Sequence, residues 1–204
     1  ALLFTTGTIN RLGSVDAGNT TSDYRDEEIE HGISTGVTPL YCDWFGHRIH
    51  LLDAPGFTDF TGEVKCAMRV ADGVVVTLRA LEGIEVETDR AWEYADEFDL
   101  PRMLVVNLLD KEHADFYDTL GRIQERFGSQ AVPVNIPIGG NESFNGVVDL
   151  ITMKALIYGS EGNGNPDAQD IPDDVADQAA EYREKLIEVA AESDDELLEQ
   201  YFEE

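Results

Sequence analysis

Apolar strand-like stretches alternate with amphipathic helix-like stretches along the first part of the chain, and this alternation limits the fold more than any other feature. A turn at Gly46 and His47 divides residues 39–53 into the two strands of a hairpin. Continuous apolar runs predict strands that are buried on both faces, whereas a helical spacing of apolar residues predicts surface helices. The strands are expected at residues 73–78 and 102–108, and the helices at residues 63–70, 85–98 and 113–127. The pattern therefore predicts an α/β fold in three layers, with a mostly parallel sheet covered on both faces.

Three turns directly follow apolar strands, at residues 53–59, 79–85 and 107–111. In open α/β sheets, ligands bind beyond the carboxyl ends of the strands. We therefore expect the functional residues in these three turns.

The character of the chain changes near residue 129. Strands are expected at residues 131–136 and 146–151, followed by a loop rich in Gly, Asn and Asp at residues 160–170. Acidic amphipathic helices are expected at residues 173–191, after Pro172, and at 194–202, where Ser193 or Asp194 is a suitable cap. We predict two domains, residues 1–128 and residues 129–204, of which the second mixes helices and strands as an α+β unit.

The chain is strongly acidic, with 42 Asp and Glu against 14 Lys and Arg in 204 residues, a formal net charge of −28. Residues 161–204 hold 16 acidic and 2 basic side chains. This charge opposes general attraction to nucleic acid, so direct DNA binding is not expected. An alternative role of the acidic side chains is to hold water and ions, as in proteins adapted to high salt. No apolar run is long enough to predict a membrane span, and the widely separated Cys42 and Cys66 favour a reducing compartment such as the cytoplasm.

The tetrapeptide Asp53-Ala54-Pro55-Gly56 ends an apolar strand in the form D-x-P-G. A carboxylate at a strand end can hold Mg²⁺ through a water, and a following glycine lets a backbone N–H approach a γ-phosphate. An ordinary Pro-Gly turn is the alternative for this tetrapeptide taken alone.

A second polar turn, residues 107–111, follows the next strand but one in the form N-x-x-D. The Asp110 carboxylate can accept hydrogen bonds from both N1–H and the 2-amino group of guanine, which adenine does not offer. A strand end followed by a helix start is the alternative.

These segments together are more specific than either alone. Residues 30–34 (EHGIS), 53–60 (DAPGFTDF) and 107–111 (NLLDK) resemble E-R-G-I-T, D-T-P-G-H-V-D-F and N-K-M-D-K of bacterial elongation factor G and its elongation-factor-G-like relatives. The resemblance covers almost the whole chain. It implies the nucleotide domain of a translational GTPase with a P-loop NTPase fold, followed by part of the insert subdomain of this factor.

The resemblance also implies roles for individual residues. Ser34 would be a hydroxyl ligand of Mg²⁺, in place of the family's Thr. Asp53 would contact both the metal and the nucleotide, Pro55 and Gly56 would lie at the γ-phosphate, and Asn107 and Asp110 would bind the guanine base. GTP or GDP and Mg²⁺ are the expected cofactors, and the ribosome is the expected partner of the full-length protein.

Two residues depart from the family pattern. Phe57 occupies the position of the catalytic His that orients the attacking water, and a benzyl group makes no ordinary hydrogen bond. Leu108 replaces a lysine, so nucleotide affinity should fall while Asp110 keeps the preference for guanine. Simple core packing is the alternative explanation of both side chains.

No phosphate-binding loop is expected within the chain. Residues 13–20 match G-x-x-x-x-G-K-[ST] except that Asn19 replaces the lysine, but a poor strand precedes them and a poor helix start follows. The resemblance places the loop and the first strand upstream of Ala1, and we expect residues 1–204 alone to bind GTP poorly and to be inactive.

Three functional hypotheses follow. The first is a piece of a ribosome-dependent GTPase that binds GTP with Mg²⁺ and promotes translocation in protein synthesis. The second, suggested by Phe57, is a guanine-nucleotide-binding regulator on the ribosome that hydrolyses GTP weakly or not at all. The third is an acidic α/β domain with unrelated ligands, which would show no preference for GDP over ADP.

Overall fold

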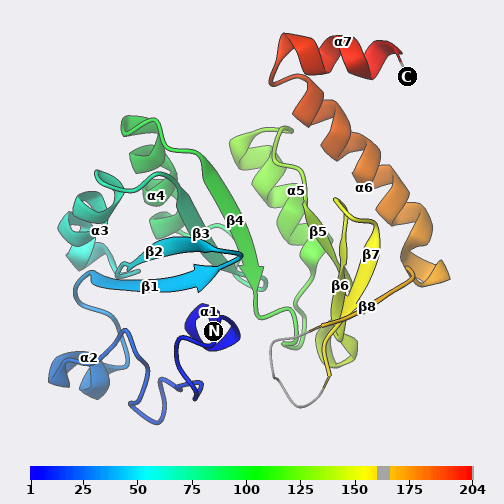
Figure 1. Cartoon of the computed structure of the whole chain (residues 1–204). Helices are drawn as coiled ribbons and strands as arrows, with labels where there is room; N and C mark the ends of the chain where they lie inside the picture. The colour runs from blue at the N-terminus through cyan, green and yellow to red at the C-terminus, as the bar shows by residue number, and fades with distance from the viewer. Residues whose placement is uncertain (160–165, 204) are drawn as a thin grey trace. The chain divides into compact units, whose positions relative to one another are not determined.

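The computed structural model describes residues 1–159 and 166–203 (Figure 1). The chain divides into two compact units, one formed by Ala1–Leu78 and Glu85–Val105 and the other by Arg79–Ile84 and Val106–Glu204. The elements of the first unit are α1 (Leu2–Thr5), α2 (Asp26–His31), β1 (Thr38–Trp44), β2 (His47–Asp53), a 3-10 turn (Thr58–Phe60), α3 (Thr61–Met68), β3 (Val74–Arg79), α4 (Val86–Glu97) and β4 (Arg102–Asn107). The last residue of β3 and the last two of β4 belong to the second unit.

The second unit contains α5 (Phe116–Phe127), β5 (Asn135–Ile138), a 3-10 turn (Asn141–Ser143), β6 (Gly146–Asp149), β7 (Lys154–Ile157), β8 (Asp167–Gln169), α6 (Asp173–Ala191) and α7 (Asp195–Glu203). None of the helices in the described part of the chain combines the length and the apolar character that a membrane span requires.

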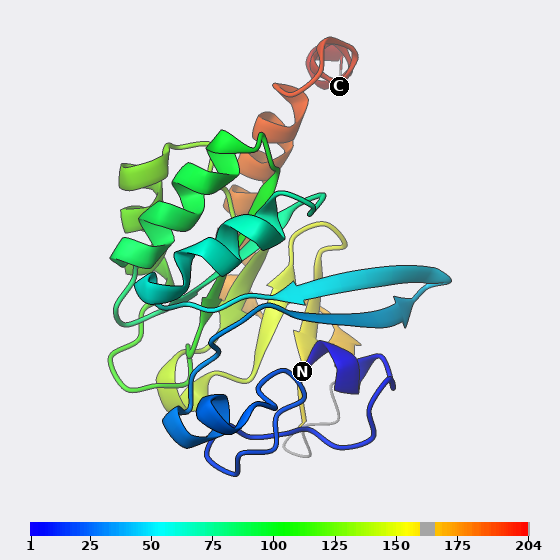
Figure 2. The same ribbon diagram turned by 90° about the vertical axis from the view of Figure 1, so that its left-hand side faces the viewer.

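Strands β1 and β2 form the antiparallel hairpin that the sequence predicts, and Figure 2 shows it as a long ribbon. Trp44 faces His47 across the end of the ladder, so Phe45 and Gly46 form the turn, and not Gly46 and His47 as the sequence predicts. Both have positive φ, 47° and 79°, as a two-residue turn of type I′ requires. Phe45 is an unusual residue for this position, because a side chain strains a left-handed backbone.

Strands β3 and β4 pair with each other. The Val74 N–H donates to the Pro101 carbonyl at one end (2.9 Å), and the Ala80 N–H donates to the Asn107 carbonyl at the other (2.9 Å). Residue numbers therefore rise in the same direction along both strands, which makes the pair parallel.

Helices α3 and α4 contact each other in the first unit through a cation. The Lys65 ammonium lies 2.6 Å from a Glu97 carboxylate oxygen and 4.5 Å from the centre of the Tyr94 ring. The carboxylate raises the pKa of Lys65 by accepting its hydrogen bond. The contact joins α4 to α3, which begins after the 3-10 turn that follows the D-x-P-G turn.

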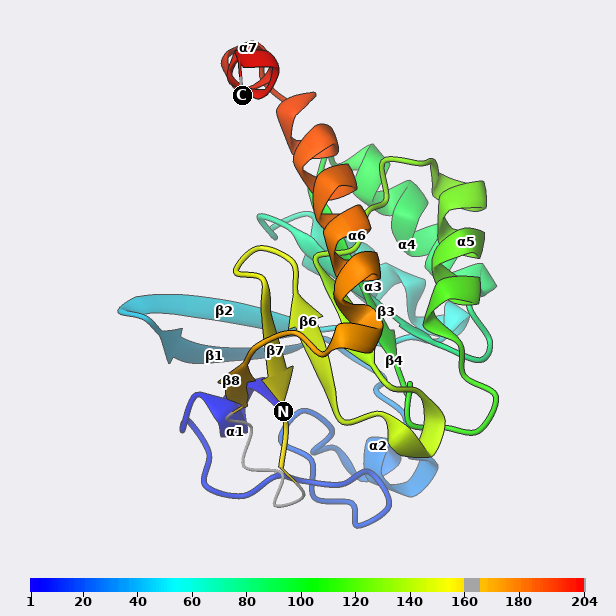
Figure 3. The same cartoon turned by 90° about the vertical axis from the view of Figure 1, so that its right-hand side faces the viewer.

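The second unit has its core between a four-stranded antiparallel sheet and helix α6, which runs along the sheet in Figure 3. The buried side chains are Ile136, Ile138, Val148, Leu150, Ala155 and Ala179. Arg183 of α6 also donates hydrogen bonds to the carbonyl oxygens of Leu150 and Ile151, where β6 ends. The helix is thus held by apolar packing and by a charged donor on backbone acceptors.

Helix α5 begins where a side chain caps it. The Asp115 carboxylate accepts hydrogen bonds from the N–H groups of Tyr117 and Asp118, at 2.8 and 3.0 Å. Such a cap satisfies donors that have no partner within the helix. The helix therefore starts at Phe116 and not at His113, where we predicted its start from the apolar spacing.

Tyr117 joins α5 to α6. Its hydroxyl donates to Gln178 Oε1 at 2.7 Å, and its ring stacks on Tyr182 with 6.0 Å between the centroids. Burial, and then the neighbouring Tyr182 and Asp115, raise the pKa of Tyr117 to about 12.

We expect this raised pKa to make stability depend on alkaline pH. An unfolded tyrosine ionises near pH 10, so the stabilisation is complete below pH 10 and is lost as the pH rises toward 12. Urea unfolding at pH 9, 10 and 11 should show a steeper loss of stability for the wild type than for Tyr117→Phe. Equal slopes would mean that Tyr117 titrates normally in the folded protein.

The elements agree with the sequence prediction where apolar residues are continuous or periodic, and differ where they are short or polar. The predicted strand 131–136 lies at Asn135–Ile138, and strand β7 was not predicted. The predicted loop 160–170 contains strand β8, and its residues 160–165 lie outside the described part. The short helix α2 was not predicted either. Four residues such as Lys154–Ile157 are too few to establish a period of two.

Candidate functional site

The D-x-P-G turn begins where strand β2 ends. Asp53 is the last residue of β2, faces Thr38 across the hairpin ladder, and has an exposed side chain. Pro55 is buried, whereas Gly56 is exposed and has open space where a Cβ would be. The turn thus presents a carboxylate and an unobstructed backbone at the carboxyl end of a strand, as the sequence predicts.

Phe57 follows this turn and directly precedes the 3-10 turn Thr58–Phe60. Its side chain is 55% exposed, so core packing does not explain the residue, and that alternative is wrong. The Thr58 hydroxyl donates to Glu87 of α4 at 2.5 Å and lowers the pKa of that carboxyl. The backbone beside Phe57 is therefore held in place while the ring itself lies at the surface.

Ser34 lies in the segment between α2 and β1. Its hydroxyl donates to Asp23 at 2.6 Å, and the same carboxylate lies 3.2 Å from the Thr20 hydroxyl. The next two residues, Thr35 and Gly36, donate to the buried carboxylate of Glu28. The Ser34 hydroxyl is thus held by Asp23, and the two residues that follow it are held by Glu28.

Two contacts bring the Ser34 segment beside the D-x-P-G turn within the first unit. The Val37 N–H donates to Glu63 of α3 at 3.0 Å, and Thr38 pairs with Asp53 in the hairpin. Asp53, at the start of the D-x-P-G turn, and Glu63, in the helix that follows the turn, thus contact Thr38 and Val37. The two candidate metal ligands therefore belong to neighbouring segments.

The donor set of these segments fits Mg²⁺ in chemistry. Among the described residues, no group of three or more His, Cys, Asp or Glu could hold a metal ion by itself. Mg²⁺ is commonly bound by one or two carboxylates together with substrate phosphates and waters, and oxygen donors suit it. The Ser34 hydroxyl and the exposed Asp53 carboxylate are donors of that kind, suited to a metal that arrives with a phosphate ligand.

The N-x-x-D turn, at the end of β4, lies in the second unit. Asn107 is exposed, and its side-chain oxygen accepts the N–H of Leu108 at 2.9 Å. Leu108 has φ 62° and is 38% exposed, so it is a strained surface residue and not part of the core. The core-packing alternative is wrong for Leu108 as well.

The base-binding candidate Asp110 is exposed and lies 3.2 Å from the Lys111 ammonium. The preceding Leu109 carbonyl accepts the Asn141 N–H at 3.1 Å, which supports the turn from the loop after β5. The Asp110 carboxylate is thus at the surface and accessible to a ligand.

The third predicted turn, residues 79–85, closes on itself through a hydrogen bond and an ion pair. The Gly83 N–H donates to the Arg79 carbonyl at 2.8 Å, and the Arg79 guanidinium pairs with Glu82 at 3.3 Å. Gly83 has φ 70°, a conformation that favours glycine. We assign no ligand contact to this turn.

Residues 13–20, which partly match a phosphate-binding loop, lack the flanking elements that such a loop needs. The short helix α1 and irregular backbone precede them, and helix α2 starts only at Asp26. The Asn19 side chain accepts the Ser14 N–H at 2.8 Å and closes the segment as a turn.

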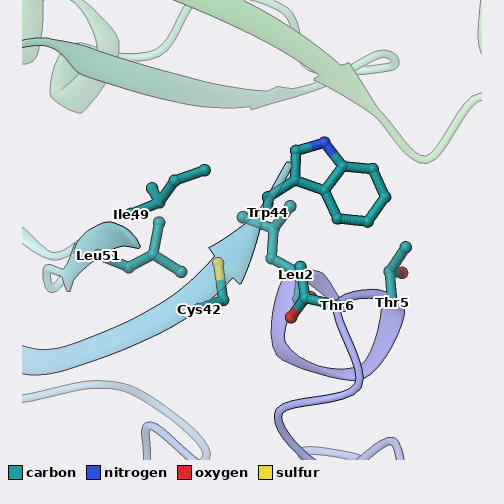
Figure 4. A pocket seen from close by; sticks show the side chains of 7 residues that line it. All are labelled: Leu2, Thr5, Thr6, Cys42, Trp44, Ile49 and Leu51. Carbon is teal, nitrogen blue, oxygen red and sulfur yellow. The ribbon is translucent and has the colours of Figure 1, made fainter. Parts of the chain in front are cut away.

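A cavity of ≈ 270 Å³ lies between α1 and the hairpin (Figure 4). Its lining is mainly apolar, and the seven residues are Leu2, Thr5, Thr6, Cys42, Trp44, Ile49 and Leu51. None of the predicted site residues lines it. The cavity and the candidate site therefore share no residues.

Sequence and structure comparisons identify the family to which the chain belongs. Residues 1–201 match the family described as the elongation factor Tu GTP binding domain. A solved crystal structure of a protein from Thermus thermophilus is similar with a TM-score of 0.91 and 35% sequence identity. The match covers 99% of this chain and 30% of that protein, so the chain spans less than a third of its relative's length.

The chain belongs to the elongation factor Tu GTP-binding domain family, and its fold is that of a translational GTPase domain. The predicted α/β fold class is confirmed by these comparisons. The described strands add that the parallel pairing is between β3 and β4. The boundary between domains at residue 128 and the roles of the site residues stay predictions.

Three carboxylates that position the site were not found from the sequence: Asp23, Glu28 and Glu63. Each binds a residue between Ser34 and Val37 from a distance of several residues or more. Glu28 lies in the acidic run 26–30, where nothing in the residue pattern distinguishes it from its neighbours. Glu28 differs from its neighbours only in the folded loop, where it accepts hydrogen bonds from Thr35 and Gly36.

Proposed function

We propose that the chain is part of a ribosome-dependent translational GTPase of the elongation factor G type, which binds GTP with Mg²⁺ in the cytoplasm and promotes translocation. The observation that supports this most is the combination of the family match with motif residues at the ends of β2 and β4. In this proposal the phosphate-binding loop and the first strand of the domain lie upstream of Ala1.

The metal end of the site is assigned to the first unit. Asp53 and Ser34 would hold Mg²⁺, and the backbone of Pro55 and Gly56 would face the γ-phosphate. The exposed Gly56 backbone supports this role, because no side chain obstructs a phosphate oxygen there. When bound, the ion neutralises phosphate charge.

The guanine end of the site is assigned to Asn107 and Asp110. An ionised carboxylate accepts hydrogen bonds but donates none, so Asp110 suits the two adjacent donors of guanine and not adenine. Its exposed side chain supports this role.

The second candidate function is a regulator that binds guanine nucleotide on the ribosome and hydrolyses GTP weakly or not at all. The exposed benzyl group of Phe57 favours it, because neither packing nor hydrogen bonding explains a phenylalanine there. Single-turnover hydrolysis by the full-length protein with ribosomes separates the two: a rate no higher than in buffer would exclude the enzyme.

The base-binding role can be tested with Asp110→Asn. Asn keeps one acceptor oxygen, so one of the two hydrogen bonds to a charged acceptor is lost; at roughly 1.5–3 kcal/mol, this is expected to weaken GDP binding by the full-length protein about 10- to 100-fold. Competition of GDP and ADP against a fluorescent guanine nucleotide measures this, with the exposed Glu112→Gln as a control that should bind normally. Equal affinity of the wild type for GDP and ADP would support an unrelated ligand.

Residues 1–204 alone should bind GTP poorly in the same assay. Micromolar affinity of this chain would contradict the proposal that the phosphate-binding loop lies outside it.

A further inference from the structure

The carboxylate of Glu28 in the first unit is buried, with the residue 1% exposed, and accepts four hydrogen bonds. One oxygen, Oε2, accepts the Arg25 N–H at 3.2 Å, at the start of α2. The other, Oε1, accepts the Thr35 N–H at 3.0 Å, the Thr35 hydroxyl at 3.2 Å and the Gly36 N–H at 3.4 Å. A single side chain therefore joins the residue before α2 to the residues just after Ser34.

A guanidinium lies beside this carboxylate and beside Gly36. The Arg25 guanidinium lies 3.8 Å from Glu28 Oε1, and a Cβ added at Gly36 would collide with that guanidinium. Burial by itself raises the pKa of Glu28, but the hydrogen bonds from Thr35, Arg25 and Gly36 together lower it. The ionised form is thus the one that the loop binds.

The order of these contacts along the chain matters for Ser34. The residues on its carboxyl side are held by Glu28, and its own hydroxyl is held by Asp23 at 2.6 Å. Helix α2 is only six residues long and almost wholly polar, so it has little apolar surface to fix the segment by packing. The hydrogen bonds of Glu28 then restrain the two residues directly after Ser34.

We propose that Glu28 is a positioning residue that holds residues 34–36 in one conformation and thereby sets where the Ser34 hydroxyl lies. Because one carboxylate accepts from Thr35 and Gly36 together, releasing it frees the whole segment at once. Its meaning for metal binding rests on the proposed role of Ser34, but the restraint itself does not.

Amide hydrogen exchange of the 204-residue protein, measured by NMR, tests the restraint directly. Glu28→Ala is expected to speed exchange at Thr35 and Gly36 by about 10- to 100-fold, since hydrogen bonds to a charged acceptor are lost. Glu28→Gln keeps one acceptor oxygen and should give a smaller increase. The matched control is Glu27→Ala, the exposed preceding residue of the same helix, which should leave both amides unchanged.

Exchange within the β1–β2 ladder separates a local from a global effect. If Thr35 and Gly36 exchange as slowly in Glu28→Ala as in the wild type, or if the ladder amides accelerate equally in both Glu28 variants, the positioning role is overturned. Thr35→Val, which removes the hydroxyl and keeps the N–H, provides a milder variant that should raise exchange at Gly36 only slightly.

A second measurement distinguishes this inference from the proposed function. In the full-length protein, the Mg²⁺ concentration needed for half-maximal GTP binding should rise in Ser34→Ala and, to a smaller extent, in Glu28→Gln. An unchanged Mg²⁺ requirement in Ser34→Ala would remove the metal role of Ser34. The hydrogen-exchange result would then still decide whether Glu28 restrains the segment.

Discussion

Replacing Leu150 by alanine is expected to lower the free energy of unfolding of the second unit by about 2–5 kcal/mol. Leu150 is fully buried between the four-stranded sheet and α6, and three of its side-chain carbons would leave a cavity. Its backbone cannot move easily to fill that space, because its N–H donates to the Val134 carbonyl at 3.0 Å and its carbonyl accepts from Arg183. Urea unfolding monitored by circular dichroism measures the change.

The adjacent residue provides the control for this substitution. Ile151 is similar in size but 62% exposed, so Ile151→Ala should change stability by no more than about 0.5 kcal/mol. Arg183 bonds the backbone carbonyls of both residues, and alanine preserves these groups. Equal losses in the two variants would mean that the core does not lie where the structure has it.

The same contrast between buried and exposed positions explains which elements could be predicted. Helix α6 lies at the predicted residues 173–191, because its apolar spacing is regular and Pro172 marks its start. Strands β3 and β4 lie within one residue of their predicted bounds, since continuous apolar runs bounded by turns indicate buried strands. In these elements the local pattern and the tertiary environment agree.

Helix α2 shows why other elements could not be predicted. Its sequence, DEEIEH, has no apolar face, and its carboxylate contacts are with residues up to eight positions away. Strand β8, with the polar sequence DAQ, likewise depends on its pairing with β7. Such elements are stabilised by partners that the local sequence does not reveal, so propensity and periodicity give no warning of them.

The residues of the candidate site also differ in whether the local sequence indicates them. Asp53, Gly56, Asn107 and Asp110 could be chosen from the sequence, because each follows an apolar strand in a recognisable spacing. The residues that orient the segment of Ser34 could not, since Asp23, Glu28 and Glu63 act through contacts across the loop. A candidate for ligand binding is thus easier to propose from the sequence than the side chains that position its segment.

Phe57→His is expected to raise the rate of single-turnover GTP hydrolysis by the full-length protein on ribosomes by about 10²- to 10⁴-fold, the usual contribution of a positioned general acid or base. The substitution should fold, because Phe57 has an ordinary extended backbone (φ −89°, ψ 141°) and a side chain that is mostly exposed. The Thr58–Glu87 hydrogen bond holds the next residue in both variants, so the imidazole would enter a backbone that is already fixed.

Phe57→Leu is the matched control, since it changes the shape of the side chain without adding a donor or acceptor. It should hydrolyse GTP as slowly as the wild type, whereas Phe57→His should gain a dependence on pH near about 6.5, where an unperturbed histidine titrates. If the histidine and leucine variants are equally slow, position 57 does not orient the water in this protein. If the wild type is already as fast as Phe57→His, another group performs that role and the enzymatic hypothesis gains over the regulatory one.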